Sequence, residues 1–248
     1  NGYFCIISSS EESFAKEVES VNNLLKARVE GLIVCLSKET KEFSHFSRLT
    51  ENDLPLVFFD RVPSGLNVPK VTVDDFSAVK NIVHHFYENG CRRIAYISGP
   101  KHLSITKNRN RGFKKGLKEC GLPFKKELLV FSDLTLTNAT AATQKLLALP
   151  QLPDAIFGIN DTIAFAAMKE IKRQGLKIPN DIALVGFTDE FHSKVVDPSL
   201  TSVTHPTFDI GKAAACLFFK MIENNNNSSE NIILQTELIV RESSIMSN

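Results

Sequence analysis

The chain has 248 residues, of which 43% are hydrophobic and 23% charged, so it is typical of one large globular domain or two smaller ones. A formal net charge of +1 excludes a global positive field for nucleic acid, and no run of about 18 apolar residues could form a transmembrane helix. The five cysteines are widely spaced without a C-x-x-C pair, which favours free thiols in a reducing cytoplasm over a disulfide framework.

The N-terminal part alternates short apolar runs with helix-like spacing. Asn1-Gly2 resembles a helix C-cap in front of a strand, so we expect the natural protein to extend further upstream. The expected strands are Tyr3–Ile7, Gly31–Leu36, Leu56–Phe59 and the short Val71–Val73, and the expected helices cover 14–25 and, more weakly, 39–50.

The same alternation continues through the middle of the chain. A helix opens at Asp74-Asp75, which supply an N-cap, and closes at Asn89-Gly90. The following strands are expected at Arg93–Ile97 and Leu128–Phe131, and the following helices at 108–120 and 138–148.

The segment 154–190 forms one strand–helix–strand unit. Ala155–Ile159 and Ile182–Phe187 are buried-strand runs, and the helix between them begins after Asn160 and ends at Gly175. Such a crossover makes the two strands parallel, and ligands bind at the carboxyl ends of parallel strands. The remaining expected elements are a strand at Leu200–Val203, a helix at Asp209–Glu223, a polar loop at Asn224–Ser229 and a last strand at Glu237–Val240.

Alternating strands and helices over the whole length predict a three-layer α/β fold with parallel sheets. Two lobes fit better than one sheet, because a single open sheet of eight or more strands is uncommon.

Polar side chains stand directly after several predicted strands. They are Asp60-Arg61, Ser98, Asp133, Asn160 and Thr188-Asp189. A rigid sheet fixes such positions, which favours a binding site, but Asp, Asn and Ser also cap helices. For any single residue both interpretations remain open. We assign Asn160 to a ligand and Asp161 mainly to capping.

Arg109 lies at the start of the predicted helix 108–120, where a cation opposes the helix dipole. Its guanidinium could enter a binding site and donate paired hydrogen bonds to a hydroxylated or anionic ligand, or it could be solvated. The four basic residues that follow at helical spacing form a solvated face, namely Arg111, Lys114, Lys115 and Lys118.

The histidines and the acidic pair Asp74-Asp75 give weaker evidence for a functional site. His84-His85 are adjacent on a helix, cannot share a metal ion and are interpreted as structural. His205 precedes Pro206 where the chain could recross between lobes, although the residue type alone favours an ordinary loop histidine. Capping explains Asp74-Asp75. No dinucleotide, P-loop, nucleophile-elbow or zinc-protease motif occurs, so the sequence gives no reason to expect an enzyme or a cofactor.

Eight segments in order make the chain resemble the effector-binding core of the lactose-repressor family of bacterial transcription regulators. They are VEGLIV (29–34), LPLVFFDR (54–61), VTVDDFSAV (71–79), NGCRRIAYISGP (89–100), RNRGFKKGL (109–117), DAIFGIND (154–161), GLKIPNDIALVGF (175–187) and DPSLTSVTHP (197–206). The resemblance covers nearly the whole chain.

This resemblance implies a periplasmic-binding-protein-like fold with two Rossmann-like lobes joined by three crossovers. The N-terminal lobe would contain 1–73 plus 204–235, and the C-terminal lobe 74–203 plus 236–248. The family's first strand and helix of the core, and its DNA-binding helix-turn-helix, have no counterpart in the sequence given. A sugar or other small metabolite would bind between the lobes, with Asp60, Arg109 and Asn160 at matching ligand-binding positions.

Four positions depart from the family pattern. Thr188 stands where an aspartate is common, which leaves Asp189 as the nearby acid, and Leu134 stands where an aromatic platform is common. His205 replaces a glutamine or other polar group, and Ile105 a small hydroxyl residue. These departures argue against a simple neutral sugar stacked on a ring.

The expected function is therefore an effector-binding and dimerisation domain of a cytoplasmic repressor that controls operator binding allosterically. It would use no metal or cofactor and touch no membrane. One alternative is a periplasmic or sensor-linked solute-binding protein of the same fold. Another is a doubly wound enzyme acting on a sugar or phosphosugar, which the missing motifs disfavour.

Overall fold

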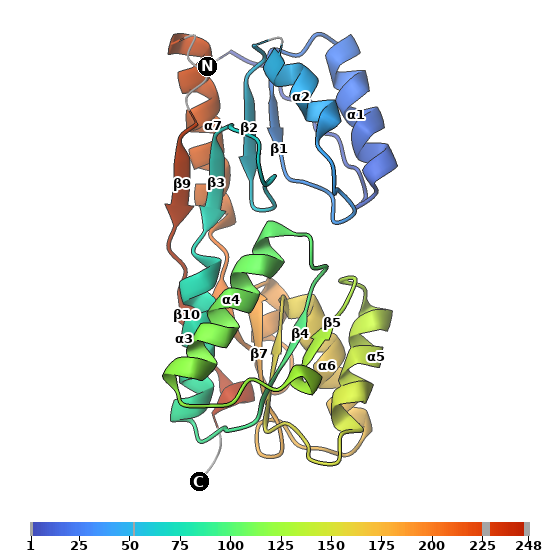
Figure 1. Cartoon of the computed structure of the whole chain (residues 1–248), viewed down its shortest axis with the longest axis vertical. Coiled ribbons are helices and arrows are strands. Elements are labelled where there is room, and N and C mark those ends of the chain that lie inside the picture. The colour runs from blue at the N-terminus through green and yellow to red at the C-terminus, as the bar shows by residue number, and fades with distance from the viewer. Residues whose placement is uncertain (1, 52, 225–228, 246–248) are drawn as a thin grey trace. The chain divides into compact units, whose positions relative to one another are not determined.

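The computed structural model of the chain describes residues 2–51, 53–224 and 229–245 (Figure 1). The chain forms two compact units. Unit 1 contains Asn1–Thr72 and Thr207–Leu234, and unit 2 contains Val73–Pro206 and Gln235–Asn248. The chain therefore passes from one unit to the other three times.

Unit 1 is built on a four-stranded sheet with the order β1-β2-β3-β9, in which β1 and β3 both pair with β2 in parallel. Its strands are β1 (Leu32–Val34), β2 (Leu56–Phe59), β3 (Lys70–Val73) and β9 (Asn231–Leu234), and its helices are α1 (Phe14–Lys26), α2 (Ser44–Glu51) and α7 (Thr207–Asn224). Helix α7 packs against β1 and β2.

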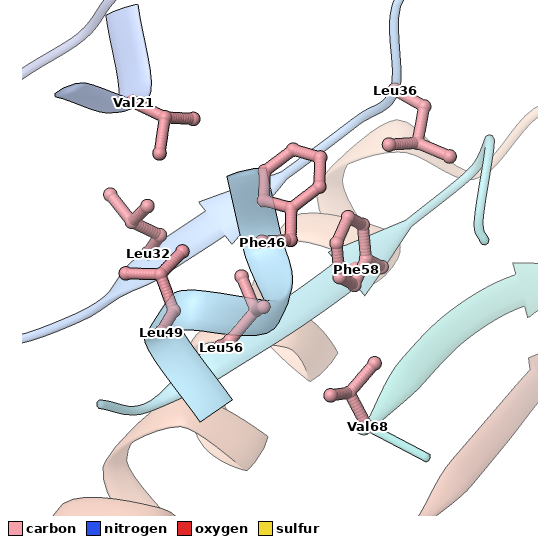
Figure 2. Packing of buried hydrophobic residues seen from close by; sticks show 8 residues of the cluster. All are labelled: Val21, Leu32, Leu36, Phe46, Leu49, Leu56, Phe58 and Val68. Carbon is pink, nitrogen blue, oxygen red and sulfur yellow. The ribbon is translucent and has the colours of Figure 1, made fainter. Parts of the chain in front are cut away.

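The core of unit 1 lies between α1, α2 and the sheet, as Figure 2 shows. Phe46 of α2 meets Phe58 of β2 edge-on, with ring centroids 5.0 Å apart. Val21, Leu32 and Leu49 complete the contact between the two helices and the first strand. The apolar residues of α1 recur at helical spacing because one face of the helix must cover this sheet.

One expectation for unit 1 was wrong, and one strand was missed. Tyr3–Ile7 forms no strand, and Phe4 is fully exposed. A strand needs a neighbour for its backbone hydrogen bonds, and in the described ranges β1 pairs only with β2. Strand β9 was missed because its residues alternate between exposed and half-buried and lack a buried apolar run. Of the expected loop Asn224–Ser229, residues 225–228 lie outside the described residues.

Unit 2 is built on a six-stranded sheet with the order β10-β8-β7-β6-β4-β5, in which only β10 is antiparallel to its neighbour. The strands are β4 (Ile94–Ser98), β5 (Leu129–Phe131), β6 (Ala155–Gly158), β7 (Ala183–Thr188), β8 (Thr201–Thr204) and β10 (Leu238–Ile239). Strands β4 and β6 are buried along their whole length, as expected for parallel strands covered on both faces.

Two helix pairs cover this sheet. Helices α3 (Asp75–Glu88) and α4 (Ser104–Glu119) pack on each other, as do α5 (Leu136–Leu147) and α6 (Asp161–Arg173). Right-handed crossovers place α4 on one face of the sheet and the α5–α6 pair on the other, which gives the predicted three layers. Short 3-10 turns, η1 (Lys126–Leu128), η2 (Phe191–Lys194) and η3 (Glu242–Ser244), complete the unit.

Helix α4 begins at Ser104, four residues before the predicted start at 108. Its N-cap residue, Leu103, provides no side-chain hydrogen bond, so the sequence carries no capping signal at the true start. No helix within the described ranges has both the length and the apolar character needed to cross a bilayer.

Candidate functional site

The carboxyl ends of the parallel strands of unit 2 share one edge of the sheet, and most predicted site residues lie along it. Ser98 ends β4, Asn160 follows β6, and Thr188 ends β7. A methyl group added at Gly99 would lie 3.0 Å from Ile159 and 3.1 Å from Leu134, so the loops after β4, β5 and β6 touch one another. The structure thus gathers Ser98, Leu134 and Asn160 at one edge.

Arg109 is 3% exposed and makes three contacts within unit 2. Its Nε donates to Asp75 Oδ1 at 2.7 Å, and its Nη1 donates to the carbonyl oxygen of Ile159. The guanidinium carbon also lies 3.5 Å from the ring centroid of Phe187 at the end of β7. Arg109 is therefore neither solvated nor at a helix start. It holds α3, α4 and the ends of β6 and β7 together.

Asp75 corrects the capping interpretation of the acidic pair. Asp74 does cap α3, accepting a hydrogen bond from Ser77 N at 3.0 Å. Asp75 instead lies buried in the ion pair with Arg109, where side-chain exposures are 4% and 3%. This pairing could not be read from the sequence, because it depends on how α3 packs against α4.

Asn160 rather than Asp161 caps α6, which corrects the capping role assigned to Asp161, and the ligand-binding role of Asn160 stays a prediction. Asn160 is the N-cap of α6, and its Oδ1 accepts a hydrogen bond from Ile163 N at 2.9 Å. Asp161 is fully buried and accepts hydrogen bonds from Ser193, Ser202 and the backbone of Glu190. Because Oδ1 serves the cap, the side-chain amide nitrogen is the part of Asn160 that the cap does not use.

Thr188 and Asp189 both have positive φ angles, +121° and +47°. Asp189 pairs with Arg241, which follows β10, at 2.7 Å, and the two side chains are 12% and 13% exposed. Sequence reasoning missed Arg241 because it lies in the C-terminal segment, far from Asp189 along the chain. The nearby acid expected at this site is thus already engaged with a cation.

The other predicted residues of unit 2 lie at the same sheet edge with varied surroundings. The Ser98 hydroxyl is buried and donates to Asn110 Oδ1 at 2.8 Å. Ile105 is half-buried in the first turn of α4, and Leu134 has a φ angle of +68°. His205 follows β8 and is also half-buried. Of these four, Ser98 already has its hydroxyl committed within the protein.

In unit 1 the predicted pair Asp60-Arg61 follows β2. Asp60 has a φ angle of +55°, and its backbone N–H donates to Val71 O at 2.9 Å. Arg61 forms two hydrogen bonds with Glu12, at 2.6 and 2.7 Å. Burial first, and then the nearby charge of Asp60, raises the pKa of the Cys35 thiol to about 11. At this edge of unit 1, the Arg61 guanidinium is therefore paired with Glu12, and the uncharged thiol of Cys35 lies beside Asp60.

The remaining histidines of the sequence analysis have partners on their own unit. His84 Nε2 lies 2.9 Å from Glu119, and His85 Nε2 lies 2.7 Å from the Ser244 hydroxyl. In the part of the chain that the structure describes, no three His, Cys, Asp or Glu side chains cluster in a way that could hold a metal ion.

Comparison with known proteins identifies the family. The profile of the periplasmic binding protein-like domain matches residues 83–244. The HTH-type transcriptional repressor CytR of Escherichia coli (strain K12) is 28% identical over 243 residues, which cover 98% of this chain and 71% of CytR. Catabolite control protein A of Priestia megaterium is 31% identical over 242 residues, 97% of this chain and 72% of that protein.

A solved structure agrees with these sequence matches. The transcriptional regulator CelR in complex with cellobiose superposes with a TM-score of 0.86 at 28% identity, over 93% of this chain and 71% of CelR. All three similar proteins are transcriptional regulators, which supports the regulator interpretation over a transport-linked solute-binding protein. The chain belongs to the lactose-repressor family and covers the effector-binding core, with the periplasmic-binding-protein-like fold, of a transcriptional regulator.

Proposed function

We propose that this core binds a small hydroxylated metabolite, a sugar or sugar derivative, through residues that follow the carboxyl ends of its parallel strands. The candidate ligand-binding residues are Arg109, Asn160 and Thr188 of unit 2 and Asp60 of unit 1. The observation that carries the proposal is the fixed guanidinium of Arg109, held by Asp75 and Phe187 at the sheet edge where ligands bind in α/β folds. The cellobiose complex of CelR supports a sugar-like ligand.

The side chains at this edge of unit 2 favour a ligand rich in acceptor oxygens. Asn160 offers its amide nitrogen, because its oxygen caps α6. Asp189 is paired with Arg241, and Thr188 supplies only a hydroxyl group where the family often has an acid. Leu134 offers no aromatic ring for stacking. A polar sugar derivative fits these groups better than a neutral sugar stacked on a ring.

Such a ligand would act through its different affinities for two conformations of the core. The coupled response is DNA binding by a helix-turn-helix domain of the whole regulator, which we place in the cytoplasm. The proposal includes no catalytic step, and chemical conversion of a bound sugar by the purified protein would contradict it.

A thermal-shift panel of sugars, sugar phosphates and nucleobases tests the binding proposal. A compound that binds only the folded core at about 100 times its Kd adds about 2.7 kcal/mol of stability. We expect Arg109→Ala to weaken binding of the best compound by about 1–3 kcal/mol in calorimetry. Arg111→Ala, on the exposed face of the same helix, is the matched control. Full affinity in Arg109→Ala would remove Arg109 from the site.

We also propose that the regulator is a homodimer. Phe191 and Val195, in and just after η2, are 73% and 61% exposed, and an interface between two copies of the chain would remove both side chains from water. A second copy of the chain is the occupant we propose for this face. Sedimentation should give a dimer that Phe191→Asp weakens, and a monomeric wild-type protein would refute the idea.

A further inference from the structure

The turn after β7 adopts a backbone conformation that its own residues disfavour. Thr188 has a φ angle of +121° and Asp189 one of +47°, and neither is glycine. Positive φ is especially unfavourable for a β-branched residue such as threonine. Strained residues of this kind persist only where the surrounding structure holds them in place. Neighbouring groups must therefore hold Thr188 and Asp189 in this conformation.

The buried carboxylate of Asp161 organises the structure around this turn. Its Oδ1 accepts a hydrogen bond from Ser202 Oγ at 2.6 Å, and its Oδ2 accepts hydrogen bonds from Ser193 Oγ and Glu190 N, both at 2.8 Å. Asp161 is also the first residue of α6, where the helix dipole favours a negative charge. A fully buried charge is thereby compensated by three donors.

Ser202 connects Asp161 to the turn. While its hydroxyl donates to Asp161, its oxygen accepts a hydrogen bond from the backbone N–H of Asp189 at 3.1 Å. The next backbone N–H, that of Glu190, binds Asp161 directly. Two consecutive amides that follow Thr188 are thus fixed by one carboxylate, one of them through Ser202.

The carboxylate of Asp161 fits closely against strand β7 because residue 186 is a glycine. A methyl group added at Gly186 of β7 would lie 2.1 Å from Asp161 Oδ1, which is far inside van der Waals contact. Any larger residue at position 186 would displace the carboxylate. The Asp189 side chain has a separate anchor, since it pairs with Arg241 at 2.7 Å.

We propose that Asp161 is a positioning residue of the effector site, which acts through Ser202 to hold Thr188 and Asp189 in their strained conformation, with Arg241 as the second anchor. The inference rests on the proposed function only in calling this turn part of the effector site. The mechanical part, that Asp161 fixes the turn through Ser202, stands without any ligand.

Residue-resolved amide hydrogen exchange by NMR, measured on the unliganded protein, tests the proposal. In Asp161→Asn we expect the amides of Asp189 and Glu190 to exchange about tenfold faster or more, while the amides of β4 and β6 change less. In Ser202→Ala, which is the milder change, we expect the amide of Asp189 to accelerate more than that of Glu190. This difference is specific to the relay and would not follow from a general loss of stability.

Ser193→Ala provides the matched control. Ser193 is as fully buried as Ser202 and donates to the same carboxylate, but it makes no contact with the Asp189 amide. The Ser193→Ala substitution should accelerate exchange of the Asp189 amide no more than exchange of the β4 amides. Equal acceleration of all these amides, or an unchanged Asp189 amide in both Asp161→Asn and Ser202→Ala, would overturn the proposal. Because no ligand is used, a failed effector screen would leave this result standing and would count only against the proposed function.

Discussion

Two neighbouring aspartates with similar sequence surroundings have different physical roles. Asp74 caps α3 at its half-buried N-terminus, whereas Asp75 neutralises the buried guanidinium of Arg109. The two aspartates differ chemically in the partner group that is left behind when the side chain is removed. Loss of Asp74 exposes a helix N–H group to water, but loss of Asp75 leaves a buried cation without its counterion.

We therefore expect unequal destabilisation from two matched alanine substitutions. Asp74→Ala should lower the free energy of unfolding by about 1 kcal/mol, the typical value of an N-cap. Asp75→Ala should lower it by about 3–5 kcal/mol, the cost of breaking a buried ion pair from one side. Urea unfolding of both variants measures the difference. Equal losses would mean that the Arg109 charge finds another partner or reaches water.

The cysteines should differ in reactivity because their burial and the nearby charges differ. Burial first, and then Asp60, raises the pKa of Cys35 to about 11, and burial, followed by Asp154, raises that of Cys91 to about 12. The thiolate is the reactive form, so both thiols should be almost unreactive at pH 8. Cys5 and Cys216 are exposed free thiols.

Native-state alkylation at pH 8, followed by peptide mass spectrometry, should label Cys5 and Cys216 well before Cys35 and Cys91. Raising the pH towards 11 should accelerate Cys35 because its thiolate fraction grows. The Asp60→Asn variant is the control for the charge contribution and should lower the Cys35 pKa. Rapid labelling of Cys35 at pH 8 in the wild-type protein would contradict the burial of this thiol.

At the scale of elements, the approach of α3 and α4 depends on glycine. A methyl group added at Gly112 would lie 2.3 Å from the carbonyl oxygen of Phe76, and one at Gly116 would lie 2.7 Å from Val83 Cβ. The absence of a side chain at Gly112 and Gly116 lets the two helices approach closely enough for Asp75 to reach Arg109. The packing of the helix pair and the ion pair are therefore two consequences of the same spacing.

Gly112→Ala should destabilise unit 2 by about 1–3 kcal/mol, because backbone atoms of α3 must move to admit the methyl group. Gly211→Ala is the matched control, since Gly211 lies within α7 and nothing is within 4 Å of an added methyl group there. It should stabilise unit 1 by up to about 1 kcal/mol through helix propensity. Thermal unfolding of the two variants should move in opposite directions, and a stabilising Gly112→Ala would refute the close approach.

The elements differ in how far sequence could predict them. The strands of unit 2 were predicted because parallel strands buried on both faces leave continuous apolar runs, as at Ala155–Gly158. The apolar run at Tyr3–Ile7 has the same appearance but no paired strand, and pairing is a non-local property. Candidate positions such as Thr188 could be placed at strand ends, whereas their supports, Asp161 and Arg241, depend on packing between distant segments.

At the scale of the whole molecule, the two units have separate cores of different character. Strands β4 and β6 of unit 2 lie within the sheet, are fully buried, and are covered by helix pairs on both faces. In unit 1, β9 lies at one end of the described sheet and is exposed or half-buried throughout. Detachment of β9 from the sheet therefore exposes little apolar surface to water, whereas detachment of β6 requires unfolding of the unit 2 core.

Hydrogen exchange of the whole chain should reveal this difference. The slowest amides should lie in β4 and β6, because they exchange only when unit 2 unfolds, and the amides of β9 should exchange faster through local opening. A low concentration of urea should accelerate β4 and β6 together, in proportion to the large surface that unit 2 exposes on unfolding, and affect β9 less. If β9 were as slow as β6 and equally sensitive to urea, the two units would unfold as one cooperative body despite their separate cores.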